Sequence, residues 1–243
     1  MSQARLIEEA SLNAWPALNS LLYDGWLLRF ANGYTKRANS ITPLYVGELN
    51  TGTKIDYCAE QYRRQGLRPI FRLAQANDIA GLDARLADRA YEQIDVTSVQ
   101  GRSLRKEFEL AARTSVVELA AWLQIFHALN PGRRDVETHE AILRRILGGL
   151  YPMVLSAGGG IVACGLGVLQ GEYLGLFDIV TRDSERRKGY GREVTESLLA
   201  WGQSQDASYA YLQVMLSNTA AQALYGQLGF GERYQYWYRV PQQ

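Results

Sequence analysis

The second half of the chain alternates between short apolar runs and segments that have one apolar face. Three apolar runs separated by glycines predict a meander of strands, at residues 153–156, 160–169 and 173–180. Val194, Leu198 and Trp201 then recur at helical spacing, which predicts a helix. A strand, a helix and a last strand follow, at residues 209–216, 219–228 and 234–240. Before the meander the pattern predicts a strand and two helices, at residues 108–112, 116–126 and 136–147.

The first half of the chain shows a similar alternation. Residues 23–31 are apolar and aromatic and predict a strand. Asn32-Gly33 is a hairpin turn signal, which would lead into a returning strand at residues 34–46. A helix, a strand, a second helix and a second strand are then predicted, at residues 54–64, 69–73, 80–89 and 94–99.

The two halves match each other when the first is shifted by 139 residues. Both then read strands, helix, strand, helix, strand, which we interpret as a duplicated fold. In the same alignment Gly189 falls on Asn50, and Tyr225 falls on Leu86. The first copy would therefore have kept the fold and lost the chemistry.

Composition and charge set broad limits on location and partners. Apolar residues make up 47% and charged residues 21%, as in ordinary soluble domains, and the net charge of +1 provides no field for nucleic acid or membrane. No apolar run approaches the roughly 20 residues of a membrane span, and residues 1–10 lack the core of a signal peptide. Cys58 and Cys164 stand outside any motif, so we expect them unbridged. We therefore expect a cytoplasmic protein, as a monomer or homodimer, without nucleic-acid or membrane partners.

Gly189 and Gly191 stand one residue apart between an apolar run and the predicted helix at Val194. Such a turn can aim several backbone N–H groups at one phosphate, with the positive end of the helix dipole behind them. Four basic side chains surround the glycines: Arg186, Arg187, Lys188 and Arg192. The pattern predicts a site for a pyrophosphate-bearing ligand, although two glycines alone would also serve a plain helix-entry turn.

Two sequence blocks together resemble the GCN5-related N-acetyltransferase (GNAT) family. Arg186-x-x-Gly189-x-Gly191 resembles its acetyl-coenzyme A signature. The second block follows 27 residues later and resembles the family's next conserved segment, Asn218-x-x-Ala221-x-x-Leu224-Tyr225-x-x-Leu228-Gly229-Phe230. The first half, with Asp24-Gly25-Trp26 and residues 34–40, resembles bacterial members that carry a degenerate copy upstream.

The resemblance implies an α/β fold of two tandem GNAT-like domains, each a mixed, mostly antiparallel sheet flanked by helices. Residues 1–105 would form the degenerate domain, and residues 106–243 would form the catalytic one. It also implies acetyl-coenzyme A as co-substrate, without a metal, in a V-shaped opening between the strands at 173–181 and 209–216.

The same resemblance implies a set of cofactor-binding residues. The pyrophosphate would lie on backbone N–H groups of Arg187, Lys188, Gly189, Tyr190, Gly191 and Arg192, with Arg186 beside them. The pantetheine arm would pair with the main chain of Ile179, Val180 and Thr181 and would reach Asn218 and Tyr225.

The implied reaction is transfer of an acetyl group to a primary amine of a small molecule, amino acid or peptide, by direct attack in a ternary complex. Tyr225 would donate a proton to the leaving thiolate, and Asn218 would hold the pantetheine arm or order a water. Asp178 is the candidate base, with Glu172 as a second carboxylate near the same strand. Strand alternation puts Asp178 and Ile179 on opposite faces and leaves open which face meets the substrate.

Several alternatives stay open at this point. The chain could be a coenzyme A-binding regulatory module without turnover, or could transfer to a hydroxyl or move a longer acyl group. Asn218 could simply cap the helix that follows it, and Tyr225 could be core packing.

Other conspicuous side chains have a plain structural interpretation. His127 and His139 stand alone without metal-ligand spacing, and the tyrosines Tyr234, Tyr236 and Tyr238 favour strand packing, with substrate lining as the alternative. Basic residues outside the glycine turn are expected to be solvated charges, with a shared groove as the alternative for the first three: Arg29, Lys36, Arg37, Arg133-Arg134 and Arg144-Arg145.

Overall fold

The computed structural model describes residues 2–77, 80–104, 108–133 and 135–242. Its strands are β1 Asn19–Tyr23, β2 Trp26–Phe30, β3 Ile41–Pro43, β4 Phe71–Ala74, β5 Tyr91–Ser103, β6 Thr114–Val116, β7 Gly149–Ala157, β8 Gly160–Gln170, β9 Tyr173–Thr181, β10 Tyr209–Met215 and β11 Gly231–Pro241. Its α-helices are α1 Gln3–Ala14, α2 Thr51–Arg64, α3 Leu82–Ala87, α4 Leu119–Leu129, α5 Val136–Leu143, α6 Tyr190–Ser204 and α7 Thr219–Gln227. Two short 3₁₀ turns, η1 Lys36–Ala38 and η2 Asp183–Glu185, complete the described elements.

The strands form one mixed, mostly antiparallel sheet, which confirms the predicted α/β fold class. Their order in the sheet is β1-β2-β3-β4-β11-β5-β10-β9-β8-β7-β6. The predicted meander is present as β7, β8 and β9, paired antiparallel. Within the described residues the parallel neighbours are β3 with β4 and β9 with β10.

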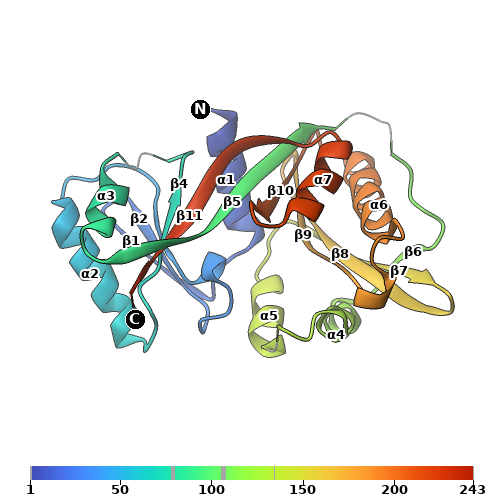
Figure 1. Cartoon of the computed structure of the whole chain (residues 1–243), viewed down its shortest axis with the longest axis horizontal. Helices are drawn as coiled ribbons and strands as arrows, with labels where there is room; N and C mark the ends of the chain where they lie inside the picture. Colours follow the sequence, from blue (N-terminus) through green and yellow to red (C-terminus); the bar gives the residue numbers. More distant parts are fainter. Residues whose placement is uncertain (1, 78–79, 105–107, 134, 243) are drawn as a thin grey trace.

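The two halves of the chain exchange strands at the middle of this sheet. The last strand, β11, lies between β4 and β5 of the first half, and β5 in turn pairs with β10. Figure 1 shows β5 and β11 as long ribbons that run from one half into the other. The boundary predicted between residues 105 and 106 lies outside the described residues, and the division into two domains stays a prediction.

Helices cover both faces of the sheet and enclose separate cores. The apolar side of α6, including Val194 and Leu198, packs on one face of β7–β10. The opposite face carries α1, α4 and α5, so a helix from the first half, with Ile7 and Trp15 at its buried side, covers strands of the second half. The α2 and α3 helices cover β2, β3 and β4.

Two predicted features of the sequence are wrong in detail. The hairpin turn lies at Asp24-Gly25, between β1 and β2, where both residues have positive φ angles of 43° and 83°. Residues 31–39 instead form a loop, because the Asn39 side chain accepts from the amides of Ala31 and Gly33 and donates to carbonyls of the same loop. Residues 108–112 form no strand, and the strand of this region is β6.

The observed elements agree with a duplicated fold, which stays a proposal. The α2 and α6 helices begin at Thr51 and Tyr190, which are 139 residues apart, as the sequence alignment requires. The order β3-α2-β4-α3-β5 in the first half repeats as β9-α6-β10-α7-β11 in the second. In each series the strands before and after the first helix are parallel neighbours in the sheet, β3 with β4 and β9 with β10.

Candidate active site

A cavity opens where the parallel strands β9 and β10 part. They pair only from Tyr209 opposite Tyr173 to Leu212 opposite Leu176. On its other side β9 pairs with β8 and carries a bulge. Asp178 and Ile179 of β9 together stand opposite the single residue Gly165 of β8. The regular pairs on either side are Phe177 with Leu166 and Val180 with Cys164. Asp178 has a φ of 47° at this bulge. Simple strand alternation therefore fails here, and the bulge decides where Asp178 points.

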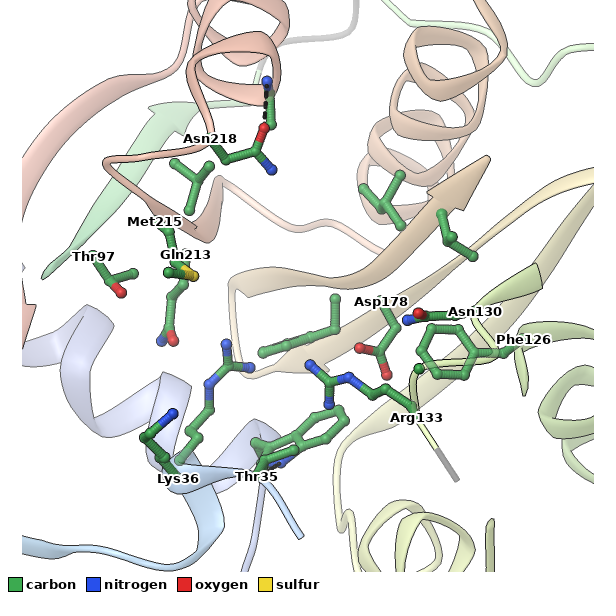
Figure 2. A pocket seen from close by; sticks show the side chains of 18 of the residues that line it. Thr35, Lys36, Thr97, Phe126, Asn130, Arg133, Asp178, Gln213, Met215 and Asn218 are labelled. Atoms are coloured by element: carbon green, nitrogen blue, oxygen red, sulfur yellow. Dashed lines mark hydrogen bonds between the residues drawn. The ribbon is translucent and has the colours of Figure 1, made fainter. Parts of the chain in front are cut away.

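The cavity has a volume of about 1090 Å³ and is lined by both halves of the chain. The first half supplies the loop after β2 and part of β5, and the second supplies the loop after α4, the ends of β9 and β10, α7 and β11. Figure 2 shows side chains from these segments converging on one space, among them Lys36, Arg133, Asp178 and Asn218.

The glycine turn beside this cavity presents unpaired backbone donors. Within the described residues no protein group accepts a hydrogen bond from the amides of residues 187–192. Gly189 has a φ of 87°, which by itself favours glycine there. Gly191 is different, because a Cβ added to it would meet only Leu224 and Thr181 at 3.6 Å, an ordinary contact. The fold does not require glycine at 191, whereas a ligand on the amides would.

The basic side chains of the turn are exposed and mostly paired with acids. Arg186 contacts Asp183 at 2.6 Å, Lys188 contacts Glu185 at 2.9 Å and Arg192 contacts Glu196 at 3.4 Å. Arg187 has no ion pair in the described part of the chain and is exposed, with a φ of 63°. Exposed basic side chains of this kind would attract a negatively charged ligand, and dissolved salt would weaken that attraction.

The corresponding turn of the first half is filled from within the protein. Asp24 accepts hydrogen bonds from the amides of Glu48 and Leu49 at 2.9 and 3.0 Å, and it contacts Lys54 at 2.9 Å. Asn50 caps α2 by accepting from Gly52, whereas no side chain caps α6 at Gly189. In the first half, the Asp24 carboxylate therefore occupies the backbone amides that a bound anion would contact at the corresponding turn of the second half.

The second sequence block, which begins at the start of α7, also contributes to the cavity wall. Asn218 caps α7 by accepting from the Ala221 amide at 3.1 Å (dashed line in Figure 2), so the capping interpretation is correct, and the residue also lines the cavity. Tyr225 lines the same cavity and packs edge-on to Phe230, with ring centroids 6.0 Å apart. Burial raises the pKa of the Tyr225 phenol to about 12.

Asp178 contacts His139, which in turn contacts His127, and this corrects the expectation that the two histidines stand alone. The imidazole Nε2 of His139 lies 3.1 Å from Asp178 Oδ2, in an ion-pair contact without the alignment of a hydrogen bond. His139 Nδ1 lies 3.2 Å from His127 Nε2, and His127 Nδ1 lies 2.6 Å from the Arg133 carbonyl oxygen. His139 is fully buried among the rings of Trp15, Tyr34, Trp122 and Phe126.

This network decides which imidazole nitrogens carry protons. The Arg133 carbonyl only accepts, so His127 carries its proton on Nδ1 and leaves Nε2 as an acceptor. His139 Nδ1 then donates to His127 Nε2. In a neutral His139 the remaining lone pair on Nε2 faces the Asp178 carboxylate. The carboxylate and the imidazole therefore face each other as two proton acceptors.

The other candidates from the sequence divide into those at the cavity and those away from it. Lys36, Arg37 and Arg133 line the cavity, so the hairpin-surface and solvated-charge interpretations are wrong for them. Tyr236 and Tyr238 also line it, whereas the Tyr234 hydroxyl donates to the buried Glu8 at 2.7 Å. Arg144 pairs with Glu140 on the surface of α5, as expected, and Arg134 lies outside the described residues.

Two further candidates take other roles. Glu172 precedes β9 at the end far from the bulge and accepts from Ser208, so it is no longer a candidate base. Arg29 is buried, and its guanidinium donates to the carbonyls of Leu12, Trp15 and Arg37, which ties α1 to the loop at η1. In the sequence, the loop at η1 was marked by residues 34–40, which contribute to the family resemblance.

Two observations concern ions and membranes. No group of three or more His, Cys, Asp or Glu side chains suited to a metal ion occurs within the described ranges, and the metal-free expectation stays a prediction. Of the helices in those ranges, none is both long and apolar enough to cross a bilayer.

Comparisons with known proteins agree with this architecture. The family model described as "Probable histone acetyltransferase Rv0428c C-terminal" matches residues 1–239. The chain is 29% identical over 255 residues to "Uncharacterized N-acetyltransferase YobR" of Bacillus subtilis (strain 168), with 99% of each chain covered. It is 30% identical over 228 residues to "Probable histone acetyltransferase Rv0428c" of Mycobacterium tuberculosis (strain ATCC 25618 / H37Rv), covering 93% of this chain and 70% of that protein.

Solved structures share the fold across the whole chain. A GCN5-related N-acetyltransferase from Kribbella flavida matches with a TM-score of 0.77 at 14% identity, covering 100% of this chain and 97% of that one. A tandem GNAT protein from the clavulanic acid biosynthesis pathway matches with a TM-score of 0.61 at 13% identity, covering 100% and 90%. The chain therefore belongs to the Rv0428c C-terminal family and has the fold of the GCN5-related N-acetyltransferases.

Proposed function

We propose that this protein transfers an acetyl group from acetyl-coenzyme A to a primary amine of a small molecule, an amino acid or a peptide, by direct attack in a ternary complex. One observation carries the proposal: the unpaired amides of residues 187–192 adjoin a cavity that holds both a carboxylate, Asp178, and a phenol, Tyr225. Relatives named as N-acetyltransferases support the same reaction type.

The residues present fit a pyrophosphate-bearing ligand at the start of α6. The free amides and the vacant side-chain position of Gly191 would receive its phosphates, within reach of Arg186, Arg187, Lys188, Tyr190 and Arg192. The edge of β9 that faces β10 has no strand partner after Leu176. The main chain of Ile179, Val180 and Thr181 would therefore pair with an extended pantetheine arm.

Tyr225 would stabilise the leaving thiolate. With a pKa of about 12 the phenol stays protonated throughout the neutral range. A simple thiol has a pKa of about 8.5, so complete proton transfer from this phenol is uphill. The role that fits these values is a hydrogen bond to the sulfur as its charge develops. Asn218, whose side-chain oxygen is engaged at the helix start, keeps its amide group for the pantetheine arm or a water.

Asp178 would accept the proton that the substrate ammonium must lose before attack. His139 would share that proton through Nε2, and His127 would hold the His139 tautomer that leaves Nε2 free. As the nitrogen–carbon bond forms and the carbon–sulfur bond breaks, the attacking nitrogen loses its second proton, which the departing thiolate takes up beside the Tyr225 hydroxyl to leave as coenzyme A thiol. The amine proton stays with the Asp178–His139 pair and passes later to solvent.

A thiol-release assay with a panel of primary amines, combined with calorimetric titration of acetyl-coenzyme A, tests the proposal. We expect micromolar-range binding of acetyl-coenzyme A and amine-dependent thiol release, with the acetylated amine identified by mass. Binding without transfer to any amine would instead support a non-catalytic coenzyme A-binding module. The cytoplasmic location and the monomeric or homodimeric state remain predictions.

A further inference from the structure

The charged side chains that line the cavity are not all paired. Lys36 contacts Asp95 at 2.8 Å, and Arg186 contacts Asp183 at 2.6 Å. Asp135 caps α5 by accepting from the Thr138 amide. The charges left at the cavity are two guanidinium groups, Arg37 and Arg133, and two carboxylates, Asp178 and the exposed Asp135.

Neither guanidinium has an acidic partner in the described part of the chain. Arg37 lies over the rings of Trp15 and Phe177, with its guanidinium carbon 5.5 Å from each ring centroid. Its Nε atom is buried and has no hydrogen-bond partner. Arg133 lies 5.8 Å from the ring centroid of Tyr34 and points into the same space as Asp178 (Figure 2).

Two neutral donors of the cavity wall are unpartnered as well. The Tyr34 side chain is 8% exposed, and no group of the described residues accepts a hydrogen bond from its hydroxyl, which the Arg133 guanidinium approaches only as a donor. The Nε2 amide group of Gln213 is also buried and unpartnered, while its Oε1 accepts from Tyr236. Buried polar groups are normally satisfied, so a set of unpaired donors around one cavity indicates a ligand that brings acceptor atoms.

We propose that the acceptor of this protein is a small zwitterionic amine, in which the reacting ammonium group and an anionic group, a carboxylate or phosphate, belong to the same molecule. This rests on the proposed function, because Asp178 receives the ammonium. The anionic group lies against Arg37 and Arg133, with Tyr34 and Gln213 as further donors. The described lining holds as many basic as acidic side chains, so a zwitterion keeps the cavity in electrical balance, whereas a lysine-rich peptide would add positive charge beside Arg37 and Arg133.

The first half of the chain holds Arg37 in place for this role. Arg29 donates to the Arg37 carbonyl at 2.9 Å, and the Asn39 amide binds the carbonyls of Tyr34 and Thr35 at 2.7 and 2.9 Å. The indole of Trp15 donates to the Thr35 hydroxyl at 3.2 Å. A guanidinium on a loop tied at these points is preorganised, so it loses little freedom when the anion binds.

Matched amine pairs test the inference. Each pair has the same carbon skeleton and differs in the anion: β-alanine against β-alaninamide, L-alanine against L-alaninamide, and O-phosphoethanolamine against ethanolamine. We expect kcat/KM for thiol release, at equal concentrations of unprotonated amine, to favour the anionic member of at least one pair by tenfold or more, the range of a charge-assisted hydrogen bond. The carboxylate and phosphate pairs distinguish the two kinds of anion. A lysine-rich peptide serves as the polybasic comparison.

Arg37→Gln should lower kcat/KM for the anionic member of the preferred pair at least tenfold more than kcat/KM for the uncharged member, because only the anionic member contacts the guanidinium. Arg144→Gln, which removes an exposed arginine of α5, is the matched control and should keep the preference. Equal kcat/KM within every pair, a better rate with the lysine-rich peptide, or an equal loss on both members in Arg37→Gln would overturn the inference.

Failure of the proposed function gives a different result. Calorimetry with the same pairs, on protein saturated with coenzyme A, reports the anion site without turnover. Preferential binding of the anionic member that Arg37→Gln abolishes, without acetyl transfer, would support the site and contradict the transferase. Equal binding of both members would overturn the site itself.

Discussion

His139 Nε2 lies 3.1 Å from Asp178 Oδ2, although the two residues come from α5 and from the bulge of β9. The contact is formed on the buried side of the cavity wall, since His139 is fully buried and Asp178 retains 11% side-chain exposure. In the proposed reaction, the Asp178 carboxylate and the imidazole behind it would act as one proton-accepting unit. The predictions for the proton chemistry follow from this arrangement.

Removing the imidazole behind Asp178 should weaken the base without removing it. We expect His139→Leu to lower kcat/KM about 10- to 100-fold at neutral pH, and Asp178→Asn to lower it about 10²- to 10⁴-fold. The double variant should be no slower than Asp178→Asn alone, because the proposed role of the imidazole is exerted through that carboxylate. A purely structural role for His139 would instead make the losses of the two single variants add in the double variant. Nitrogen-15 shifts of His127 should identify the Nδ1–H tautomer in the wild-type protein.

Tyr225→Phe should lower kcat for amine acetylation by about 10- to 100-fold, while the fold and the affinity for acetyl-coenzyme A are retained. The loss arises because the thiolate leaves without a hydrogen bond to the phenol. Since burial raises the pKa of this phenol to about 12, the wild-type rate should show no basic limb from Tyr225 until well above pH 10. Equal kcat in the two proteins across pH would remove Tyr225 from the mechanism.

Gly191→Val should weaken binding of acetyl-coenzyme A severely, by 100-fold or more in calorimetric titration. The side chain would stand at the helix entry where phosphates approach the amides, whereas its nearest protein atoms lie at an ordinary 3.6 Å. The matched control is Gly160→Val, on the β7–β8 turn, where a Cβ meets nothing within 4 Å. An unchanged affinity in Gly191→Val would contradict the phosphate site.

Glu8→Gln should lower the free energy of unfolding by about 3–5 kcal/mol, because it leaves the Arg72 charge buried without a counter-ion. Both side chains are 1% exposed, and the pair joins α1 to β4. Glu9→Gln removes an exposed carboxylate that lies 3.6 Å from Arg5 and should change stability by less than about 0.5 kcal/mol. Urea unfolding measures both, and equal midpoints would contradict the prediction.

The same pair makes a prediction about pH. Burial acts to raise the pKa of Glu8, but the charge and hydrogen bonds of Arg72 outweigh it and hold that pKa below its ordinary 4.5. A carboxyl with a lowered pKa stabilises the fold above its unfolded value, and the contribution is lost as pH falls through the folded value. The wild-type protein should therefore lose more stability below about pH 4.5 than Glu8→Gln does.

Much of the second half was predictable from the sequence because its signals are local. The meander of β7, β8 and β9 follows from apolar runs between glycines, and α6 and α7 follow from apolar residues at helical spacing. The glycine turn before Tyr190 depends on the backbone angles of Gly189, and the cap at Asn218 depends on a hydrogen bond to the nearby Ala221 amide. Both features are therefore decided by residues close together in the sequence. The resemblance to the acetyltransferase family, now confirmed, rested on these segments.

The acceptor side of the cavity depends instead on contacts between residues far apart in the chain. His127, His139 and Asp178 meet only because α4, α5 and a bulged strand pack on one face of the sheet. Arg37 reaches Phe177 only because buried Arg29 ties α1 to the η1 loop, a position that a hydrophilic hairpin pattern does not reveal.

The sequence by itself therefore determined the family, the fold class and the glycine turn before α6, since periodicity and turn chemistry depend on adjacent residues. Only the tertiary structure decided how the halves share β5 and β11, which histidines back Asp178, and which arginines face the cavity without a partner. Those features arise from burial, and the packing of distant segments determines which polar groups are buried and which of them remain unpaired.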